Sequence, residues 1–218
     1  MKTLVVTGAS RGIGKAIAEK FLSESWYVIG TSTSGKASLK RDNFEIYKLD
    51  VSDPESIERF AKALARSKKK IDVLINNAGV YLDEDTSPLN TKALRKTLEV
   101  NLIGLADLTE RLLPHINNGA HIISMSSGAG SITDEPDAYK PAYQISKAAV
   151  NMFTRTLAEA LKKRNITVSS VDPGWVRTDM GSSSAPRDPK EPAEEIFKMA
   201  TSEVNSGFFW HKNKKRAW

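Results

Sequence analysis

The sequence contains no cysteine, which excludes disulfide bonds and metal sites built on thiolates. Histidine is scarce, and the three present are scattered without carboxylates at the spacing of metal ligands: His115, His121 and His211. No apolar run approaches the roughly 18 residues that a membrane-spanning helix requires, and the opening segment is too short in its apolar part for a signal peptide. These absences predict a protein without a metal ion or a membrane anchor, for which a reducing cytoplasm is the default location.

Positive charge is what the sequence has in excess: 32 Lys and Arg residues stand against 26 Asp and Glu, a formal net charge of +6. Two basic runs stand out, at 66–70 and 211–216. A nucleic-acid-binding surface would gather such charge with aromatic side chains on one face. The first run instead falls at the expected end of a helix, where cations complement the dipole, and the second falls in the C-terminal tail. We interpret both as solvated surface and expect no nucleic-acid partner.

Short apolar runs alternate with helical patterns from end to end, which predicts repeated βαβ units. Such units give an α/β fold with a doubly wound parallel sheet and helices on both faces. With no low-complexity segment or linker, residues 1–218 are expected to form a single domain. The expected strands are 3–8, 27–32, 44–50, 71–79, 121–127 and 166–174, with 208–210 as a last edge strand. The expected helices are 12–25, 52–67, 90–113 and 143–163, with Asp53 as the N-cap of the second.

Residues 180–195 interrupt this alternation. They hold three serines and three prolines, which favours a loop over a core element. We expect residues 180–200 to form a short lid over the substrate.

The first strand runs into "TGASRGIG" at residues 7–14, which places glycines at 8, 12 and 14. Gly8 would allow the sharp turn off the strand, Gly12 would let a pyrophosphate approach the backbone, and Gly14 would let the following helix pack on the sheet. Three glycines after a strand also suit an ordinary turn. The strand before them and the amphipathic helix after them favour a dinucleotide site, with the helix N-terminus facing the phosphates.

A second pattern, "YQISK", puts Tyr143 and Lys147 four residues apart, on one face of a predicted helix. A lysine beside a phenol favours the phenolate and lowers the phenol's pKa from its usual value of about 10. In isolation this spacing more often marks a half-buried tyrosine with a solvated lysine. Tyr139 is the other nearby phenol, but it has Tyr143 rather than a lysine four residues on.

Seven features occur in the order found in one family: residues 7–14, Asp50 after the third strand, "NNAG" (76–79), Asn101 in "VNLIG", "SS" (126–127), "YQISK" (143–147) and "DPGWVRTDM" (172–180). In these features the sequence resembles the short-chain dehydrogenase/reductase family over essentially its whole length. "GWVRTDMG" and the ending "SGFFW…W" also resemble the C-factor and sniffer-type carbonyl reductase branch. The resemblance implies a Rossmann-like fold.

The resemblance also implies catalytic roles. Tyr143 would be the general acid in carbonyl reduction and the general base in the reverse direction, and Lys147 would bind the nicotinamide ribose and lower the pKa of Tyr143. Ser127 would hydrogen-bond the substrate oxygen, and Asn101 would fix a water that links Lys147 to solvent. Ser127 is preferred over Ser126 because the family's serine typically precedes two residues and a glycine, but Ser126 stays an alternative.

The cofactor implied by the resemblance is a nicotinamide dinucleotide. The residues expected around it are Gly8, Ser10, Arg11, Gly12, Ile13, Gly14, Thr33, Asp50, Val51, Asn77, Ala78, Gly79, Tyr143, Lys147, Pro173, Gly174, Val176 and Thr178. An NAD site usually carries an acid at the end of the second strand, where this chain has serine and threonine at 32–34. Arg11 could bind a 2′-phosphate, so we expect NADP(H) to be preferred over NAD(H); the alternative is that Arg11 is a solvated loop residue.

The sequence therefore predicts an NADP(H)-dependent oxidoreductase that interconverts a carbonyl and an alcohol in a small-molecule substrate. The alternative is a dinucleotide-binding regulatory or signalling protein of the C-factor type. We expect a homodimer or homotetramer built from the two long helices, as in much of the family. Ser127 and Tyr143 are 16 positions apart, which indicates a small insertion near the substrate mouth. The substrate itself is not encoded in any recognisable motif.

Overall fold

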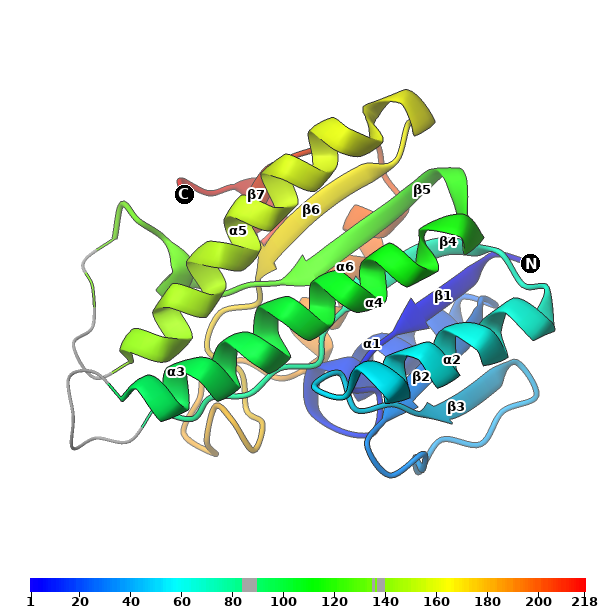
Figure 1. Cartoon of the computed structure of the whole chain (residues 1–218), viewed down its shortest axis with the longest axis horizontal. Helices are drawn as coiled ribbons and strands as arrows, with labels where there is room; N and C mark the ends of the chain where they lie inside the picture. Colours follow the sequence, from blue (N-terminus) through cyan, green and yellow to red (C-terminus); the bar gives the residue numbers. More distant parts are fainter. Residues whose placement is uncertain (84–89, 135, 137–139) are drawn as a thin grey trace.

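The computed structural model describes residues 1–83, 90–134, 136 and 140–218. Within them one eight-stranded sheet has the order β3-β2-β1-β4-β5-β6-β7-β8 (Figure 1). The strands are β1 (Thr3–Val6), β2 (Tyr27–Ser32), β3 (Phe44–Lys48), β4 (Ile71–Asn76), β5 (Ile116–Met125), β6 (Thr167–Asp172), β7 (Phe208–His211) and β8 (Lys214–Lys215). Neighbouring strands are parallel except for the pair β7–β8. The expected α/β fold with a doubly wound parallel sheet is confirmed.

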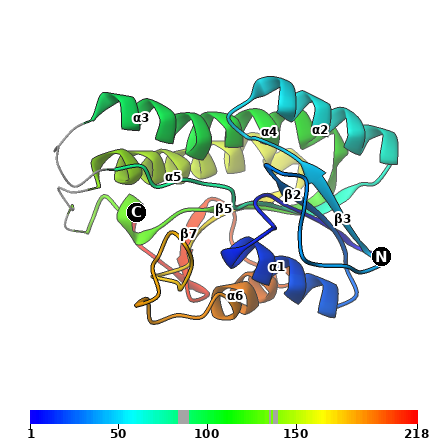
Figure 2. The same ribbon diagram turned by 90° about the horizontal axis from the view of Figure 1, so that it is seen from below.

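Helices cover both faces of this sheet (Figure 2). One face carries α2 (Pro54–Ser67), α3 (Thr91–Leu98), α4 (Gly104–Leu112) and α5 (Pro141–Leu161), and the other carries α1 (Gly12–Ser23) and α6 (Lys190–Ala200). Side chains of a strand alternate between the two faces. Leu4 and Val6 of β1 therefore join the core cluster under α1 and α6, whereas Val5 joins the cluster under the other four helices.

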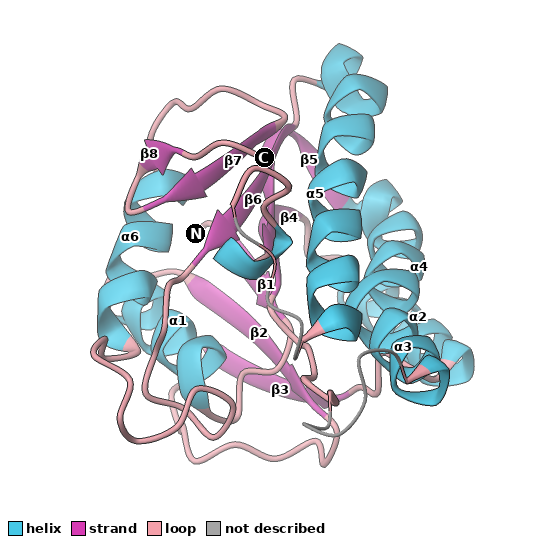
Figure 3. Cartoon of the chain, turned by 90° about the vertical axis from the view of Figure 1, so that its left-hand side faces the viewer, coloured by secondary structure: helices cyan, strands magenta, loops and turns pink. Residues whose placement is uncertain are grey.

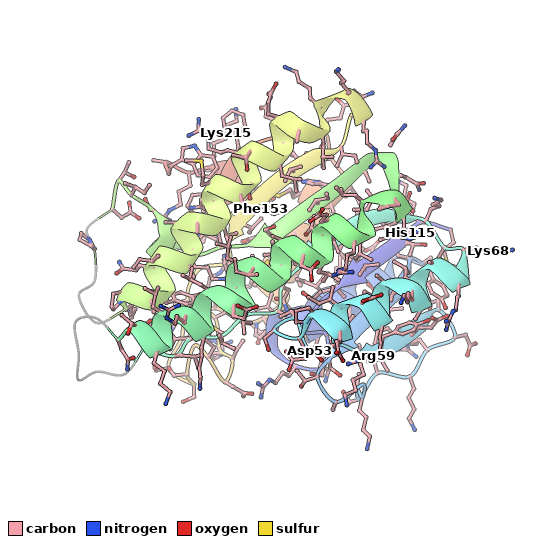
Figure 4. The ribbon with its side chains drawn as sticks, viewed as in Figure 1. Asp53, Arg59, Lys68, His115, Phe153 and Lys215 are labelled. Atoms are coloured by element: carbon pink, nitrogen blue, oxygen red, sulfur yellow. The ribbon has the colours of Figure 1, made fainter. Side chains whose placement is uncertain are left out.

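The start of α2 agrees with the sequence in detail. The Asp53 side chain accepts a hydrogen bond from the Glu55 backbone N–H, as expected of an N-cap, and Pro54 occupies the first turn. Arg59 lies beside Asp53 at 3.2 Å (Figure 4). Among the described residues, no helix has both the length and the apolar character needed to cross a membrane.

Two expected elements differ from the structure. The helix expected over 90–113 is present as one continuous coil, but a π-helical turn at Glu99–Ile103 lies within it, between α3 and α4. The expected loop 180–195 is wrong from Lys190 onward, where α6 begins, so half of the expected lid 180–200 is core structure. Prolines are tolerated in the first helical turn, and Ile196 and Phe197 pack α6 onto the cluster around Phe21.

The carboxyl ends of the parallel strands meet at one edge of the sheet, and Figure 3 views the molecule from that side. Strand order reverses between β1 and β4, because the chain runs outward from β1 through β2 to β3 and then returns past β1 to form β4. In open α/β sheets such a switch point is where ligands bind. The glycine-rich turn follows β1, "NNAG" ends β4, the two serines follow β5 and residues 172–178 follow β6. The fold thus gathers the segments that the sequence analysis singled out.

Candidate active site

Tyr143 lies in the first turn of α5, which a distant carboxylate holds in place. The backbone N–H groups of Ala142 and Tyr143 donate to the two oxygens of Asp83, each at 2.9 Å. The phenol ring packs edge-on against Tyr81, with ring centroids 5.4 Å apart. Asp83 was not identified from the sequence, and no local pattern marks a capping residue about 60 positions away from its helix. Tyr139 lies outside the described residues.

The environment of the Tyr143 hydroxyl does not favour its ionisation. Burial raises the pKa of Tyr143 above its ordinary value, while a hydrogen bond with Ser127 acts in the opposite direction. The pKa of Tyr143 is therefore shifted upward, opposite to the expected direction, because burial outweighs the effect that lowers it. The lysine is itself buried, and burial lowers the pKa of Lys147 to about 8. Its Nζ donates to the Met125 carbonyl at 2.8 Å and lies 5.4 Å from the centroid of the Tyr143 ring.

The two adjacent serines after β5 have different neighbours. Ser127 hydrogen-bonds with Tyr143 and accepts from the Ala129 backbone N–H, so it caps the short helical turn at Gly128–Gly130. Ser126 is buried and donates to the main-chain carbonyl of Lys147 at 3.3 Å. The geometry brings Ser127, rather than Ser126, to the phenol.

Asn101 sits in the π-helical turn, and π-turns are frequent at functional sites. Its amide is 1% exposed, donates to the Val80 carbonyl and the Ser146 hydroxyl at 3.0 Å each, and accepts from the Val80 N–H at 2.8 Å. A Cβ at Gly79 would lie 3.2 Å from Asn101 Oδ1 and 3.7 Å from Lys147 Nζ, so Gly79 leaves the space between the two side chains open.

The glycine-rich turn has the geometry that a pyrophosphate requires. Gly8 and Gly12 have φ values of 70° and 55°, in the left-handed region that favours glycine. A Cβ on Gly14 would fall 2.3 Å from the Gly8 carbonyl oxygen, so only glycine fits there. At the start of α1 the residue Arg11 provides no side-chain cap and the first turn has no acid, which leaves its amides facing an incoming anion.

Thr7 and Asn77 connect this turn to the end of β4. The Thr7 hydroxyl accepts from the backbone N–H groups of Asn77 and Ala78 at 2.9 and 2.8 Å. The Asn77 amide donates back to the Thr7 carbonyl at 2.8 Å. Thr7 was not among the predicted site residues, although it opens the glycine motif. These residues fit a bound dinucleotide, because they fix a side-chain-free cradle at the switch point of the sheet.

The remaining predicted cofactor residues lie along the same edge. Thr33 is exposed just after β2, and Asp50 forms a local turn by accepting from the N–H and hydroxyl of Ser52 at 2.9 and 2.7 Å. Thr178 reaches over the glycine-rich turn, where its methyl would lie 3.2 Å from a Cβ on Gly12. Four further residues are buried or partly buried beside these segments: Ser10, Ile13, Val51 and Val176. Pro173 and Gly174 begin the loop after β6.

The predicted 2′-phosphate residue, Arg11, is exposed and forms an ion pair with Asp179 at 2.8 Å. This pair joins the glycine-rich turn to the loop after β6. At the end of β2 the Ser32 hydroxyl hydrogen-bonds with the backbone of Lys36, so no carboxylate occupies the place that an NAD site gives to an acid. An anion bound here would compete with Asp179 for the guanidinium.

Two readings of the C-terminal region need correction. His211 does have a carboxylate partner, since its Nδ1 lies 3.1 Å from Asp172 Oδ2. The basic run 211–216 is not wholly solvated either, because Arg216 pairs with Asp172 at 3.0 Å and also contacts Asp134. Both partners come from segments distant in the sequence, so spacing could not reveal them. No three His, Asp or Glu side chains among the described residues are placed to hold a metal ion.

Comparisons with known proteins identify the family of this chain. A family model described as short chain dehydrogenase matches residues 2–189. A 3-oxoacyl-(acyl-carrier-protein) reductase of Vibrio cholerae is 36% identical over 186 residues, covering 82% of this chain and 75% of that protein. The NADPH-bound carbonyl reductase from chicken fatty liver superposes with a TM-score of 0.90 at 28% identity, over 100% of this chain and 99% of that one. The putative carbonyl reductase Sniffer of Caenorhabditis elegans gives 0.85 at 29% identity, with 100% of both chains covered.

Proposed function

The chain belongs to the short-chain dehydrogenase family, and on that premise we propose that it is an NADP(H)-dependent oxidoreductase that interconverts a ketone or aldehyde and an alcohol. The observation that carries the proposal is the partly buried phenol of Tyr143, hydrogen-bonded with Ser127 and close to Lys147, at the same sheet edge as the glycine-rich cradle. The relatives named above as carbonyl and oxoacyl reductases support the same reaction class.

The bound nicotinamide would supply or accept the hydride. Tyr143 would give its hydroxyl proton to the oxygen of the reduced carbonyl, and its raised pKa keeps that proton in place at neutral pH. Ser127 would donate a hydrogen bond to the same oxygen and stabilise the charge that develops there. Lys147 would bind ribose hydroxyls, and its lowered pKa suits a group that returns a proton to the phenol from solvent by way of the Asn101 region.

The phenol proton is the test of this mechanism. Tyr143→Phe should abolish carbonyl reduction, because general acid catalysis typically contributes about 10²–10⁴-fold, while the cofactor still binds. The measurement is a carbonyl panel followed by cofactor absorbance, with cofactor binding titrated separately and Tyr139→Phe as the matched control. Carbonyl reduction by Tyr143→Phe at the rate of the unaltered protein would contradict the mechanism. Cofactor binding without turnover of any carbonyl by the unaltered protein would favour the regulatory alternative instead.

The preference for NADP(H) rests on Arg11 and on the missing acid after β2. A charge-assisted contact is worth roughly 1.5–3 kcal/mol, or about one to two decades of affinity. We expect at least about a tenfold preference in kcat/KM, which Arg11→Ala should largely erase. Asp179→Asn is the matched variant: it frees the guanidinium from its ion pair and should tighten NADPH binding without improving NADH binding. Equal activity of the unaltered protein with NADH would refute the preference.

A further inference from the structure

Asp172 is a buried carboxylate at the end of β6, with its side chain 6% exposed. Oδ1 accepts from the Gly174 backbone N–H at 2.9 Å. Oδ2 faces two nitrogen atoms from the C-terminal region: Arg216 Nη1, just after β8, at 3.0 Å, and His211 Nδ1, at the end of β7, at 3.1 Å. A buried carboxylate is costly unless it is paired, so these contacts account for its place in the fold. None of the proposed catalytic steps uses them.

Arg216 has a second attachment, to the segment that follows Ser127. Its Nη2 pairs with Asp134, and two residues further on the Trp218 carbonyl accepts from the Thr133 backbone N–H at 2.9 Å. The indole of Trp218 stacks on Phe209 of β7, with ring centroids 5.9 Å apart. The residues after β8 therefore pack on the sheet through Trp218 and contact the segment 128–134 at Thr133 and Asp134.

This C-terminal contact reaches the proposed catalytic serine through Gly128. A Cβ at position 128 would lie 3.1 Å from Arg216 Nη2 and 3.2 Å from Asp172 Oδ2, so the ion pair lies directly against the backbone after Ser127. Ser127 in turn hydrogen-bonds with Tyr143. After burial, the negative charge of Asp172 is among the causes that raise the pKa of Tyr143.

We propose that Arg216 is a positioning residue for the Ser127–Tyr143 pair, holding the segment after Ser127 against β6 and neutralising the Asp172 carboxylate behind the phenol. The inference rests on the proposed function and adds to it a control of the proton-transfer group by the C-terminal segment. The charged or titratable groups around the phenol are then Lys147 on α5, Tyr81 after β4, Asp172 on β6, and Arg216 and His211, each of which contacts Asp172.

Two variants distinguish an electrostatic effect of Arg216 on Tyr143 from a purely mechanical one. Arg216→Gln removes the guanidinium that faces Asp172 and should raise the apparent pKa of Tyr143 by roughly half to one unit. Asp172→Asn removes the negative charge and leaves the guanidinium with Asp134, so it should lower the same pKa by a similar amount. A purely structural clamp would impair both variants in the same direction and leave the titration unchanged.

The experiment measures the pH profile of kcat/KM for alcohol oxidation, in which the phenolate is the active form, for the full chain and each variant. Near-ultraviolet titration of the phenols, with the spectrum of Tyr143→Phe subtracted, gives the Tyr143 pKa without turnover. Lys214→Gln is the control, because Lys214 is an exposed cation on β8 close to Arg216 in sequence. Arg216→Lys should keep the charge and restore most of the profile at the cost of a higher KM.

Opposite shifts in the two variants, with the control unchanged, support the inference. Unshifted titration in both Arg216→Gln and Asp172→Asn, or shifts of the same sign, would overturn it. Should Arg216→Gln not fold, the predicted downward shift in Asp172→Asn and the Arg216→Lys profile still decide the matter. Absence of any carbonyl turnover by the unaltered protein would refute the proposed function alone, because the phenol titration still reports on Arg216.

Discussion

The start of α5 shows how a single carboxylate can set the position of a catalytic group. Lys140, at the N-cap, does not cap the helix with its side chain, and Pro141 has no backbone N–H to satisfy. The next two N–H groups belong to Ala142 and Tyr143, and both are bound by Asp83. Because Tyr143 is held by its own backbone N–H, movement at this cap moves the phenol directly.

We expect Asp83→Ala to lower the free energy of unfolding by about 1 kcal/mol, the usual cost of a lost N-cap, and to reduce kcat by more than tenfold. Asp83→Asn should recover most of both quantities, because the amide oxygen can still accept one hydrogen bond. Denaturant unfolding and steady-state kinetics measure the two effects. Asp53→Ala is the matched control, since it removes a comparable cap from α2, far from the phenol, and should lower stability without changing kcat.

At this scale the sequence identified the main reactive groups but not their supports. Tyr143, Lys147 and Ser127 were recognised from motifs, and the structure brings them together. Asp83 and Arg216 were missed because each contacts a segment dozens of positions away, which no local spacing encodes. The sign of the Tyr143 pKa shift was also missed, since burial depends on the packing around a helix rather than on the residue four positions along it.

Between β5 and β6, the histidine at position 121 is a buried titratable group without a catalytic role. Its Nε2 lies 2.9 Å from the Ser169 hydroxyl on the neighbouring strand. Burial lowers the pKa of His121 to about 4, well below its ordinary value of 6.5, so the folded protein carries it neutral at neutral pH. The strand pair is therefore built around an uncharged imidazole.

Because the pKa of His121 is lower in the folded protein than in the unfolded chain, the unfolded chain binds the proton first as the pH falls. The free energy of unfolding is therefore unaffected by His121 above a pH of about 6.5 and decreases as the pH falls from about 6.5 toward about 4. The separation of about 2.5 units between the two pKa values corresponds to at most roughly 3.4 kcal/mol. We expect urea unfolding to show this loss in the unaltered protein and a flatter pH dependence in His121→Gln. His115→Gln, which changes a less buried histidine, should retain the original slope.

The elements themselves were predicted well where one periodicity dominates. Strands β1 to β4 and helices α1 and α2 have nearly the expected bounds, because β-branched runs and capping signals mark them clearly. The helix α6 was missed because three prolines dominate its surroundings, although its apolar stripe packs on α1. The π-turn at Glu99–Ile103 leaves the apolar spacing almost unchanged, so it is invisible in the sequence.

Over the whole molecule, the sheet and its helices leave one face with exposed apolar side chains. Ile145 and Met152 lie seven residues apart on the same side of α5 and are 44% and 54% exposed. Ile103, the last residue of the π-helical turn before α4, is 52% exposed. In Figure 1 the two helices run side by side on the face toward the viewer. A helix of 21 residues is about 30 Å long, enough for one side of a standard interface of about 800 Å² per partner.

We therefore expect two copies of the chain to associate through α4 and α5, in a homodimer or in a homotetramer that contains this contact. Sedimentation at micromolar concentration should show a multiple of the 24.0 kDa chain. Replacing both Ile145 and Met152 with Asp would bury two charges from each copy in the contact, because a symmetric contact contains the same residues of both copies. This double variant should sediment as the 24.0 kDa monomer. Ile132→Asp is the control, because Ile132 is 78% exposed but lies in the segment after β5 rather than on α4 or α5. A single 24.0 kDa species in the unaltered protein would contradict the association, and dissociation by Ile132→Asp as well would show that α4 and α5 are not its specific site.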